Sequence, residues 1–327
     1  MIEAALRAAA VPPFHAMAMS REASALEASG RRVLHLEVGQ PSTPLPRAAR
    51  DAIRNHLDRP LGYTNAAGLQ SLRRRLAERE GVGVERVVVV AGASAGFTLA
   101  FLALFDADAR VGVVEPGYPC YRNALLALGI TPVAIPVGPD TRWAPTADHL
   151  DRAGHLDGLI VASPSNPTGT VLRDDALREV ALTCRRRGIP VIGDEIYHGI
   201  VDRPPAPRLL DHEPDAVVVN SFSKYWSMTG WRVGWTVVPD SLADTVERLQ
   251  QNLFICAPHV SQVAALAALD ATDELDGHVD RYRRNKTVLI EGLAAAGITE
   301  IAPADGAFYV YAHVAHLTTA LGLDSLQ

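Results

Sequence analysis

Short apolar runs rich in valine and isoleucine alternate with longer helix-forming stretches along the middle of this chain of 327 residues. The apolar runs predict strands at 87–90, 111–114, 131–135, 158–161, 191–193, 217–219 and 233–237. Helices are expected between them, at 97–105, 121–128, 174–187 and 240–253. Continuous apolar strands separated by helices predict an α/β fold, with a mostly parallel central sheet and helices on both faces.

The two ends of the chain depart from this alternation. Residues 46–255 are expected to form a large α/β domain, and residues 1–45 and 256–327 a smaller, split α+β domain. Ligands of open parallel sheets bind beyond the carboxyl ends of the strands. Polar motifs that directly follow the predicted strands are therefore the candidates for a functional site.

Composition narrows the range of partners. The net charge of -6, without a basic block, argues against nucleic acid, and no apolar stretch is long enough to span a bilayer. Cys120, Cys184 and Cys256 are odd in number and far apart, which favours a reducing compartment over a disulfide framework or a zinc site. We expect a cytoplasmic protein that binds neither membranes nor metal.

Lys224 lies in the sequence Ser-Phe-Ser-Lys directly after a predicted strand, and Arg232 follows eight residues later. An amine, the hydroxyls of Ser221 and Ser223, and a guanidinium together could hold a phosphorylated aldehyde as an imine. The simpler alternative is an ordinary surface lysine that follows a strand. The motif is too short to decide between the two by itself.

Residues 92–96, Gly-Ala-Ser-Ala-Gly, follow the predicted strand 87–90 and enter a helix. Small residues and a helix N-terminus suit an anion, and Ser94 adds a hydroxyl. The same pattern, with Glu115 at the end of the next strand, also resembles a dinucleotide-binding unit. The glycine spacing is not Gly-x-Gly-x-x-Gly, so the dinucleotide interpretation ranks second.

Residues 163–169, Ser-Pro-Ser-Asn-Pro-Thr-Gly, follow the predicted strand 158–161. Proline, asparagine and glycine together form a rigid turn, so a structural loop is one interpretation. The functional interpretation is that the Asn166 amide donates a hydrogen bond to a phenolic oxygen.

Asp194 and Tyr197 follow the predicted strand 191–193. A carboxylate at a buried strand end needs a partner, and a protonated ring nitrogen would serve. Tyr197 could then hydrogen-bond an oxygen of the same ring. The structural alternative is a helix-capping aspartate beside a core tyrosine.

Two further tyrosines complete the candidate set. Tyr118 lies just past the predicted strand 111–114 and could stack on a flat cofactor, although a single aromatic residue there is more often packed in the core. Tyr63, between two glycine-containing turns, is either a turn residue or a ligand contact.

These motifs, in this order, supply what pyridoxal phosphate requires, and the chain resembles the class I/II (fold type I) aminotransferases. The resemblance runs from about residues 36–41 to residues 304–309. It rests on Ser-Asn-Pro-Thr-Gly, on Asp-x-x-Tyr, and on Ser-x-Ser-Lys with a downstream arginine. The resemblance implies ping-pong transamination between an amino acid and a 2-oxo acid. A carbon–sulfur β-lyase of the same fold and an inactive cofactor-binding dimer stay open.

The resemblance also implies roles for single residues. Lys224 would form the aldimine with pyridoxal 5'-phosphate and then move the substrate α-proton, and Asp194 would keep the pyridine nitrogen protonated. Asn166 and Tyr197 would bind the phenolic oxygen, and Tyr118 would stack on the ring. The phosphate would be surrounded by Ala93, Ser94, Ser221, Ser223 and Arg232. Tyr63 would reach the phosphate of a neighbouring subunit, which implies a homodimer, and Gly39 would lie near the substrate carboxylate.

The chain departs from the family in one respect. The family binds the substrate α-carboxylate with an arginine in a strand close to the C-terminus, whereas no arginine follows Arg284 here. Residues 324–327 look like the start of a helix, with Asp324 as its N-cap. We therefore expect an incomplete small domain and an unpaired sheet edge near residues 307–311.

Overall fold

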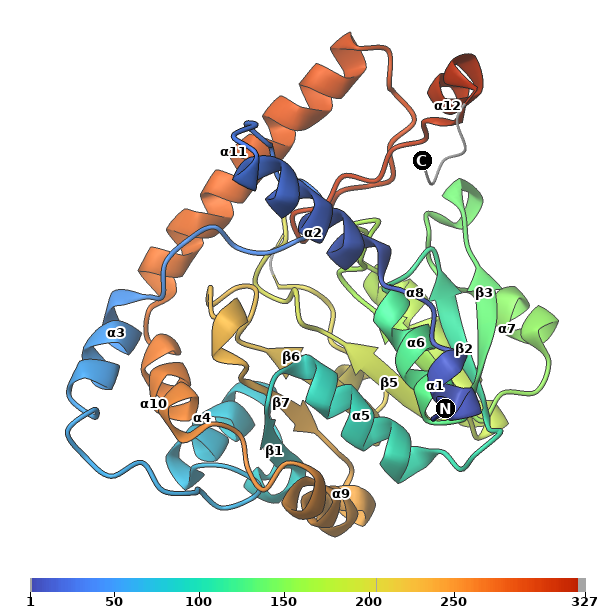
Figure 1. Ribbon diagram of the computed structural model, residues 1–327. Coiled ribbons are helices and arrows are strands. Elements are labelled where there is room, and N and C mark those ends of the chain that lie inside the picture. The colour runs from blue at the N-terminus through green and yellow to red at the C-terminus, as the bar shows by residue number, and fades with distance from the viewer. Residues whose placement is uncertain (1, 204, 323–327) are drawn as a thin grey trace.

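The computed structural model describes residues 2–203 and 205–322 and has a seven-stranded sheet at its centre (Figure 1). The order across the sheet is β1-β7-β6-β5-β4-β2-β3. The strands are β1 (Val87–Val90), β2 (Arg110–Glu115), β3 (Thr131–Pro136), β4 (Gly158–Ala162), β5 (Val191–Asp194), β6 (Val217–Ser221) and β7 (Gly234–Val237). Every strand predicted from the sequence is present.

The sheet is parallel except at one strand. β7 runs antiparallel to both β1 and β6, whereas the pairs among β2, β3, β4, β5 and β6 are parallel. Because β7 runs in the opposite direction, it begins at the edge where its neighbours end. Ser221 at the end of β6 is therefore opposite Gly234 at the start of β7.

Helices cover both faces of the sheet, as the sequence predicted. Alternate valines of β1 point to opposite sides: Val88 and Val90 pack into one core, and Val87 and Val89 into the other. The first core is closed by α5 (Ala93–Leu104), α6 (Pro119–Ala127) and α9 (Asp240–Leu253). The second is closed by α4 (Gln70–Glu80), α7 (Ala147–Ala153), α8 (Asp174–Arg187) and α10 (His259–Ala268).

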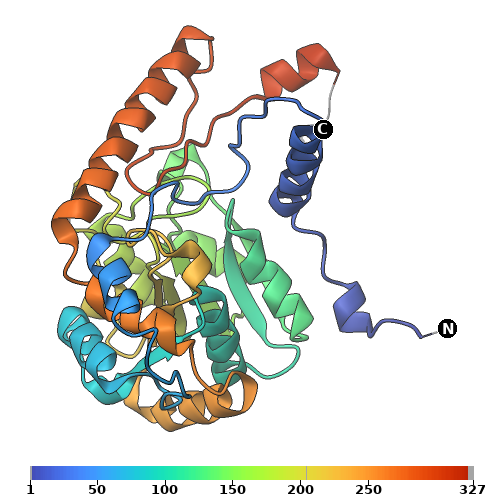
Figure 2. The ribbon, with the colours of Figure 1, turned by 60° about the vertical axis from the view of Figure 1, so that its left-hand side comes forward.

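The remaining helices come from the two ends of the chain. They are α1 (Leu6–Ala9), α2 (His15–Ala28), α3 (Arg47–Arg54), α11 (Thr272–Ala295) and α12 (Ala315–Leu321). α1 packs against α6, and α3 against α10. Figure 2 shows α1 and α2 along one side of the molecule, with α11 on the opposite side. α2 buries none of its residues. Within the described residues, no helix is long and apolar enough to cross a membrane.

The segment after α11 folds back toward the sheet. Residues 300–302 pair with residues 311–313 through the Ile301–Ala312 bridge and two further backbone hydrogen bonds of 2.8 Å. Gly306 bridges Val201, and the Ala307 N–H donates to the Ile200 carbonyl at 2.8 Å. Of residues 307–311, expected as an unpaired sheet edge, Ala307 and Tyr311 make backbone hydrogen bonds. The predicted helix start at 324–327 lies outside the described residues.

Candidate active site

The predicted motifs meet along one edge of the sheet. Ala162 at the end of β4 is opposite Asp194 at the end of β5, which in turn is opposite Val219 in β6. The loops that follow β1, β4, β5 and β6, and the start of β7, therefore open toward the same side. Segments 92–96, 163–169, 194–197 and 221–224 all begin there.

Lys224 points its amine at the backbone of the N-terminal segment. Its Nζ donates to the Gly39 carbonyl at 2.8 Å and lies 5.5 Å from the centre of the Tyr197 ring and 5.9 Å from that of Phe308. Burial lowers the pKa of Lys224 to about 8, against the opposing attraction of Asp194. An appreciable fraction of this amine is therefore uncharged near neutral pH, as a nucleophile or proton carrier requires.

Asp194 is buried at the end of β5 and is held by two donors. The Tyr121 hydroxyl donates to Oδ2, and the backbone N–H of Ile196 donates to Oδ1 at 3.0 Å. Burial raises the pKa of Asp194 to about 6, although both hydrogen bonds and the charge of Lys224 pull that pKa down. The sequence predicted a cationic partner for this carboxylate. Within the described residues Asp194 forms no ion pair, and Lys224 is the cation that influences it.

Tyr121 is a site residue that the sequence interpretation missed. It lies in α6, three residues after Tyr118, and its ring meets the Tyr118 ring edge-on with 5.4 Å between centroids. The spacing of the two tyrosines across the first turn of a helix was the one available signal. Burial raises the pKa of Tyr121 well above its ordinary range, so its hydroxyl keeps the proton that it donates to Asp194.

Tyr197 is buried beside Lys224, and its hydroxyl is 2.5 Å from the hydroxyl of Tyr309. Tyr309 lies at the end of the stretch over which the sequence resembles the family, and the sequence predicted no role for it. Its hydroxyl also fills the space beside Gly39, because a Cβ built on that glycine would collide with it. Burial raises the pKa of both phenols, Tyr197 most strongly, so both stay protonated.

Asn166 and Tyr118 share a cavity with Tyr121, the residue that donates to Asp194. Asn166 lines a narrow cavity together with Tyr118, Tyr121 and Trp143. Tyr118 is partly buried and lines this cavity, and its ring meets the rings of Phe14 and Tyr121 edge-on. The sequence analysis predicted neither Tyr121 nor Trp143 as a site residue.

The start of α5 faces the guanidinium of Arg232. Gly92 precedes the helix with φ +84°, and a Cβ at that position would collide with Nη2 of Arg232. Nη1 of Arg232 donates to the Thr229 carbonyl at 3.0 Å, and no carboxylate of the described residues pairs with this arginine. A free guanidinium beside the N–H groups of Ala93 and its neighbours is suited to a phosphate.

Hydroxyl groups complete this end of the site. The Ser221 hydroxyl is 2.9 Å from that of Ser223, and the Ser223 N–H donates to Ser221 Oγ at 3.1 Å. Ser94 is exposed in the first turn of α5. These residues and Arg232 come from two separate connections, the one after β1 and the one between β6 and β7, and the register of these three strands brings them to one place.

Tyr63 lies apart from this group in the loop between α3 and α4. Its side chain is 85% exposed. The residues on either side of it are held at α10, since His259 hydrogen-bonds the Gly62 carbonyl and Gln262 hydrogen-bonds Thr64. Tyr63 is thus held on the surface of this protomer.

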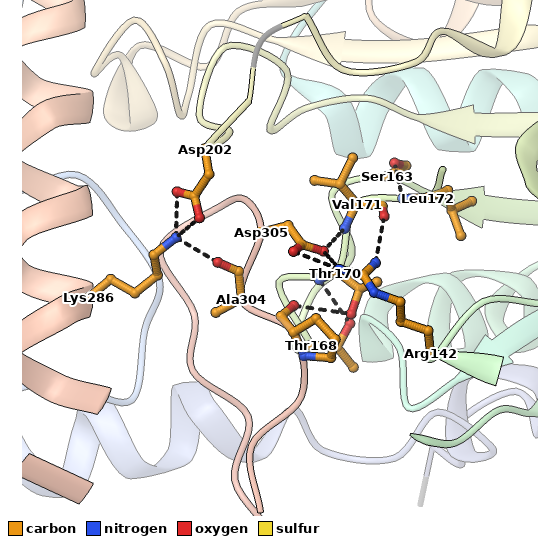
Figure 3. Close-up of polar contacts among 11 residues, drawn as sticks. Arg142, Ser163, Thr168, Thr170, Val171, Leu172, Asp202, Lys286, Ala304 and Asp305 are labelled. Carbon is orange, nitrogen blue, oxygen red and sulfur yellow. Dashed lines mark hydrogen bonds and ion pairs between the residues drawn. The ribbon is translucent and has the colours of Figure 1, made fainter. Parts of the chain in front are cut away.

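Two ion pairs hold the segment that carries Phe308 and Tyr309 (Figure 3). Asp305 pairs with Arg142 from the loop after β3 and also accepts the Val171 N–H at 3.3 Å. On the other side, Lys286 of α11 bonds both Asp202 and the Ala304 carbonyl, at 2.5 and 2.6 Å. Tyr309 is therefore placed against Tyr197 by contacts with three separate parts of the chain.

The family model for aminotransferase class I and II matches residues 31–323 of the chain. The chain belongs to this family. Its cofactor is accordingly pyridoxal 5'-phosphate, and its substrates are amino acids and 2-oxo acids.

Individual relatives agree with the family match. The chain is 46% identical to the valine–pyruvate aminotransferase of Mycobacterium tuberculosis over 96% of this chain and 84% of that protein. It superimposes on the crystal structure of an aminotransferase from Mycobacterium tuberculosis with a TM-score of 0.93 and 44% identity, covering 98% and 85% of the two chains. Its TM-score to the aspartate aminotransferase from Thermus thermophilus with maleate is 0.91 at 27% identity, covering 95% and 85%.

These matches confirm the predicted fold type I architecture, the cofactor and the class of enzyme. The protein is a pyridoxal-phosphate-dependent aminotransferase. The carbon–sulfur lyase and dinucleotide interpretations are not favoured, because the relatives that match over most of the chain are named aminotransferases.

Proposed function

We propose that this aminotransferase moves the amino group of valine, or of an amino acid with a similar apolar side chain, to pyruvate. The relative whose name contains these two substrates is 46% identical over 96% of the chain. The surroundings of Lys224 support an apolar donor, because the rings of Tyr197 and Phe308 border its amine.

The single observation that carries the catalytic assignment is the environment of Lys224. Its amine is buried, is held at 2.8 Å by the Gly39 carbonyl, and has its pKa lowered to about 8. We assign to it the attachment of the cofactor and the transfer of the substrate α-proton. An amine with this pKa can release and regain a proton close to neutral pH.

The residues around Lys224 fit pyridoxal phosphate. When bound, the cofactor supplies the electron-accepting ring that makes the substrate α-proton acidic. Asp194, buried and held by Tyr121, would place negative charge beside the ring nitrogen. Asn166 and Tyr197 would donate hydrogen bonds to the ring oxygen, and Tyr118 would pack on the ring face.

The opposite end of the site would hold the phosphate. Arg232 forms no ion pair with the described carboxylates, so its charge is available to an anion. We assign phosphate binding to the groups that surround this guanidinium, namely Ala93, Ser94, Ser221, Ser223 and Arg232. Gly39 would lie beside the substrate carboxylate.

We further propose a homodimer. Tyr63 is 85% exposed on a loop held by α10, and we expect it to reach the phosphate of the partner subunit. The division into a large domain at 46–255 and a smaller domain at 1–45 and 256–327 stays a prediction. So does the cytoplasm as the compartment, which follows from the odd number and wide spacing of the three cysteines.

Lysine content makes the attachment test unambiguous, because Lys224 and Lys286 are the only lysines in the sequence. Borohydride reduction of the wild-type enzyme loaded with cofactor, followed by peptide mapping, should fix the cofactor to Lys224. K224R should carry no cofactor after reduction and should lose transamination, whereas K286R keeps its cation near Asp202 and should retain both. Label on Lys286, or an active K224R enzyme, would refute the assignment.

The substrate test compares amino donors with pyruvate and with 2-oxoglutarate as acceptors. Valine with pyruvate should give alanine at the highest kcat/KM among the pairs. If an acidic donor such as aspartate is preferred, the substrate proposal is wrong. Release of ammonia and pyruvate from a sulfur amino acid without an acceptor would point to β-elimination.

A further inference from the structure

We infer that Tyr309 is a positioning residue that fixes the direction of the Tyr197 O–H bond. The inference rests on the proposed role of Tyr197 as a hydrogen-bond donor to the ring oxygen of the cofactor. The two hydroxyls are 2.5 Å apart; Tyr197 is buried and Tyr309 is partly buried, and the Lys224 amine lies 5.5 Å from the centre of the Tyr197 ring.

The direction of the shared proton decides what Tyr197 can do. A phenol has one proton to donate and can accept hydrogen bonds through its oxygen. If Tyr197 donates to Tyr309, no proton is left for a ligand. If Tyr309 donates to Tyr197, the proton of Tyr197 is free to point at the cofactor, and the incoming hydrogen bond makes Tyr197 a stronger donor.

The backbone around Tyr309 keeps its hydroxyl in this place. The Gly306 N–H donates to the Gly169 carbonyl at 2.9 Å, and the Ala307 N–H to the Ile200 carbonyl at 2.8 Å. Ala307 adopts φ +55°, a conformation that alanine rarely takes and that tertiary contacts must maintain. The residues just before Tyr309 are thus held by backbone hydrogen bonds to the loops that follow β4 and β5.

Gly39 lies directly against the Tyr309 hydroxyl. A Cβ at residue 39 would overlap the Tyr309 hydroxyl, so the absence of a side chain there lets the hydroxyl approach the backbone. The carbonyl of the same glycine accepts the hydrogen bond from Lys224. One hydroxyl is therefore packed against the two groups, Tyr197 and Gly39, that we assign to cofactor and substrate.

The titratable groups that act on Tyr197 are few. They are Tyr309, Asp194 and Tyr118, together with the Lys224 amine over its ring. Only Tyr309 makes a hydrogen bond to the Tyr197 hydroxyl among the described residues. Removing the Tyr309 hydroxyl is thus a selective change to the donor strength of Tyr197.

The test is a pH titration of the visible absorbance of the bound cofactor in wild type, Y309F, Y197F and the double variant. A hydrogen bond to the ionised ring oxygen favours the ionised form. Y309F should weaken this hydrogen bond and should therefore raise the pH midpoint of the absorbance titration by about 0.5 pH unit. Y197F should raise it further, and adding Y309F to Y197F should change it no more. Y311F is the matched control, because Tyr311 packs on Trp143 and not on Tyr197.

Each outcome decides the inference. A shift in Y309F that is absent from Y311F and disappears in the Y197F background supports it. An unshifted Y309F midpoint, an equal shift in Y311F, or an equal shift by Y309F in both backgrounds overturns it. So does a folded Y309F protein that no longer takes up cofactor, because the hydroxyl would then serve binding itself. Failure of the wild type to attach cofactor at Lys224 would instead refute the proposed function.

Discussion

A single nitrogen of Arg142 donates to both carboxylate oxygens of Asp305, at 2.8 and 2.7 Å. The two residues are 163 positions apart, and the pair joins the loop after β3 to the segment that carries Tyr309 (Figure 3). Both side chains are about one-third exposed, so solvent screens the pair. Its geometric effect on Tyr309 should therefore exceed its effect on stability.

D305N removes the charge and keeps the shape of the side chain. We expect it to lower the free energy of unfolding by about 1 kcal/mol, because the ion pair is lost and the contact with the Val171 N–H is weakened. The transamination rate should fall by more than any loss of folded protein explains, since Tyr309 is less firmly held. Urea unfolding and steady-state kinetics measure the two effects. D51N, in the exposed pair with Arg54, is the control and should change neither. Equal effects of D305N and D51N would contradict the positioning role.

G92A introduces a methyl group where Nη2 of Arg232 lies. The guanidinium must move, and losing one charge-assisted contact with the phosphate should weaken cofactor binding by about tenfold to a hundredfold. The dissociation constant follows from fluorescence or equilibrium dialysis of the apoenzyme. G188A tests the backbone alone, because Gly188 has φ +65° at the end of α8 with no atom within 4 Å of a new Cβ. G188A should lose about 1 kcal/mol of stability, and G92A somewhat more because φ +84° with ψ 164° is a region kept almost entirely for glycine, yet only G92A should bind cofactor weakly. Normal cofactor binding by G92A would argue against Arg232 as the phosphate ligand.

K224M should stabilise the apoenzyme, and the gain should depend on pH. Burial lowers the pKa of Lys224 to about 8 from an ordinary value of 10.5, so the unfolded chain holds a proton that the folded chain releases between these values. Stability of the wild type therefore rises as pH increases from 8 to 10.5. K224M lacks this titration. Its advantage over the wild type should be about 2 kcal/mol at pH 7 and should shrink toward pH 10. Urea unfolding at several pH values measures the gap, and a gap that is constant with pH would refute the lowered pKa.

E195Q should also be more stable than the wild type, but its advantage should grow as pH rises. Glu195 is buried next to Asp194, and burial raises its pKa to about 7, even though its Oε1 accepts the Leu209 N–H at 2.8 Å. The folded protein keeps a proton that the unfolded chain loses above its ordinary pKa of 4.5. The wild type therefore loses stability as pH rises from 4.5 to 7. Glutamine keeps the acceptor without the charge, so E195Q should be about 2 kcal/mol more stable than the wild type at pH 8 and nearly equal at pH 4.5.

The control for E195Q is E179Q on the exposed face of α8. Its stability difference from the wild type should stay within about 0.5 kcal/mol at every pH. Thermal or urea unfolding at pH 4.5, 6 and 8 separates the variants. An E195Q difference that grows as pH falls would reverse the sign and contradict the prediction.

Local pattern was sufficient for the sheet and for the order of the site motifs. Runs such as 87–90 and 217–219 are β-branched and have a polar or glycine residue within two positions of each end, so each predicts a strand by itself. α8 and α9 were predicted at the bounds that the structure shows, because their apolar residues follow a helical period. α5 begins at Ala93, four residues before the predicted start, because small residues at 93–96 carry no such period.

Contacts between distant residues could not be predicted in the same way. Tyr121 and Asp194 are 73 positions apart, and Tyr197 and Tyr309 are 112 apart. Each contact depends on strand register and on where a loop crosses the sheet, which single-residue preferences do not contain. The hydrogen bond from Lys224 to Gly39, over 185 positions, follows only when the N-terminal segment is placed above the strand edge.

The reversed direction of β7 has a consequence for how distances in the site are maintained. Because β7 starts where β6 ends, the chain passes from Lys224 to Arg232 without crossing to the far edge of the sheet. Lys224 and Arg232 thus lie in one short connection whose two ends, Ser221 and Gly234, are paired in the sheet. The backbone spacing between these two residues is therefore set by the pairing of β6 with β7 and not by the two ends of the chain.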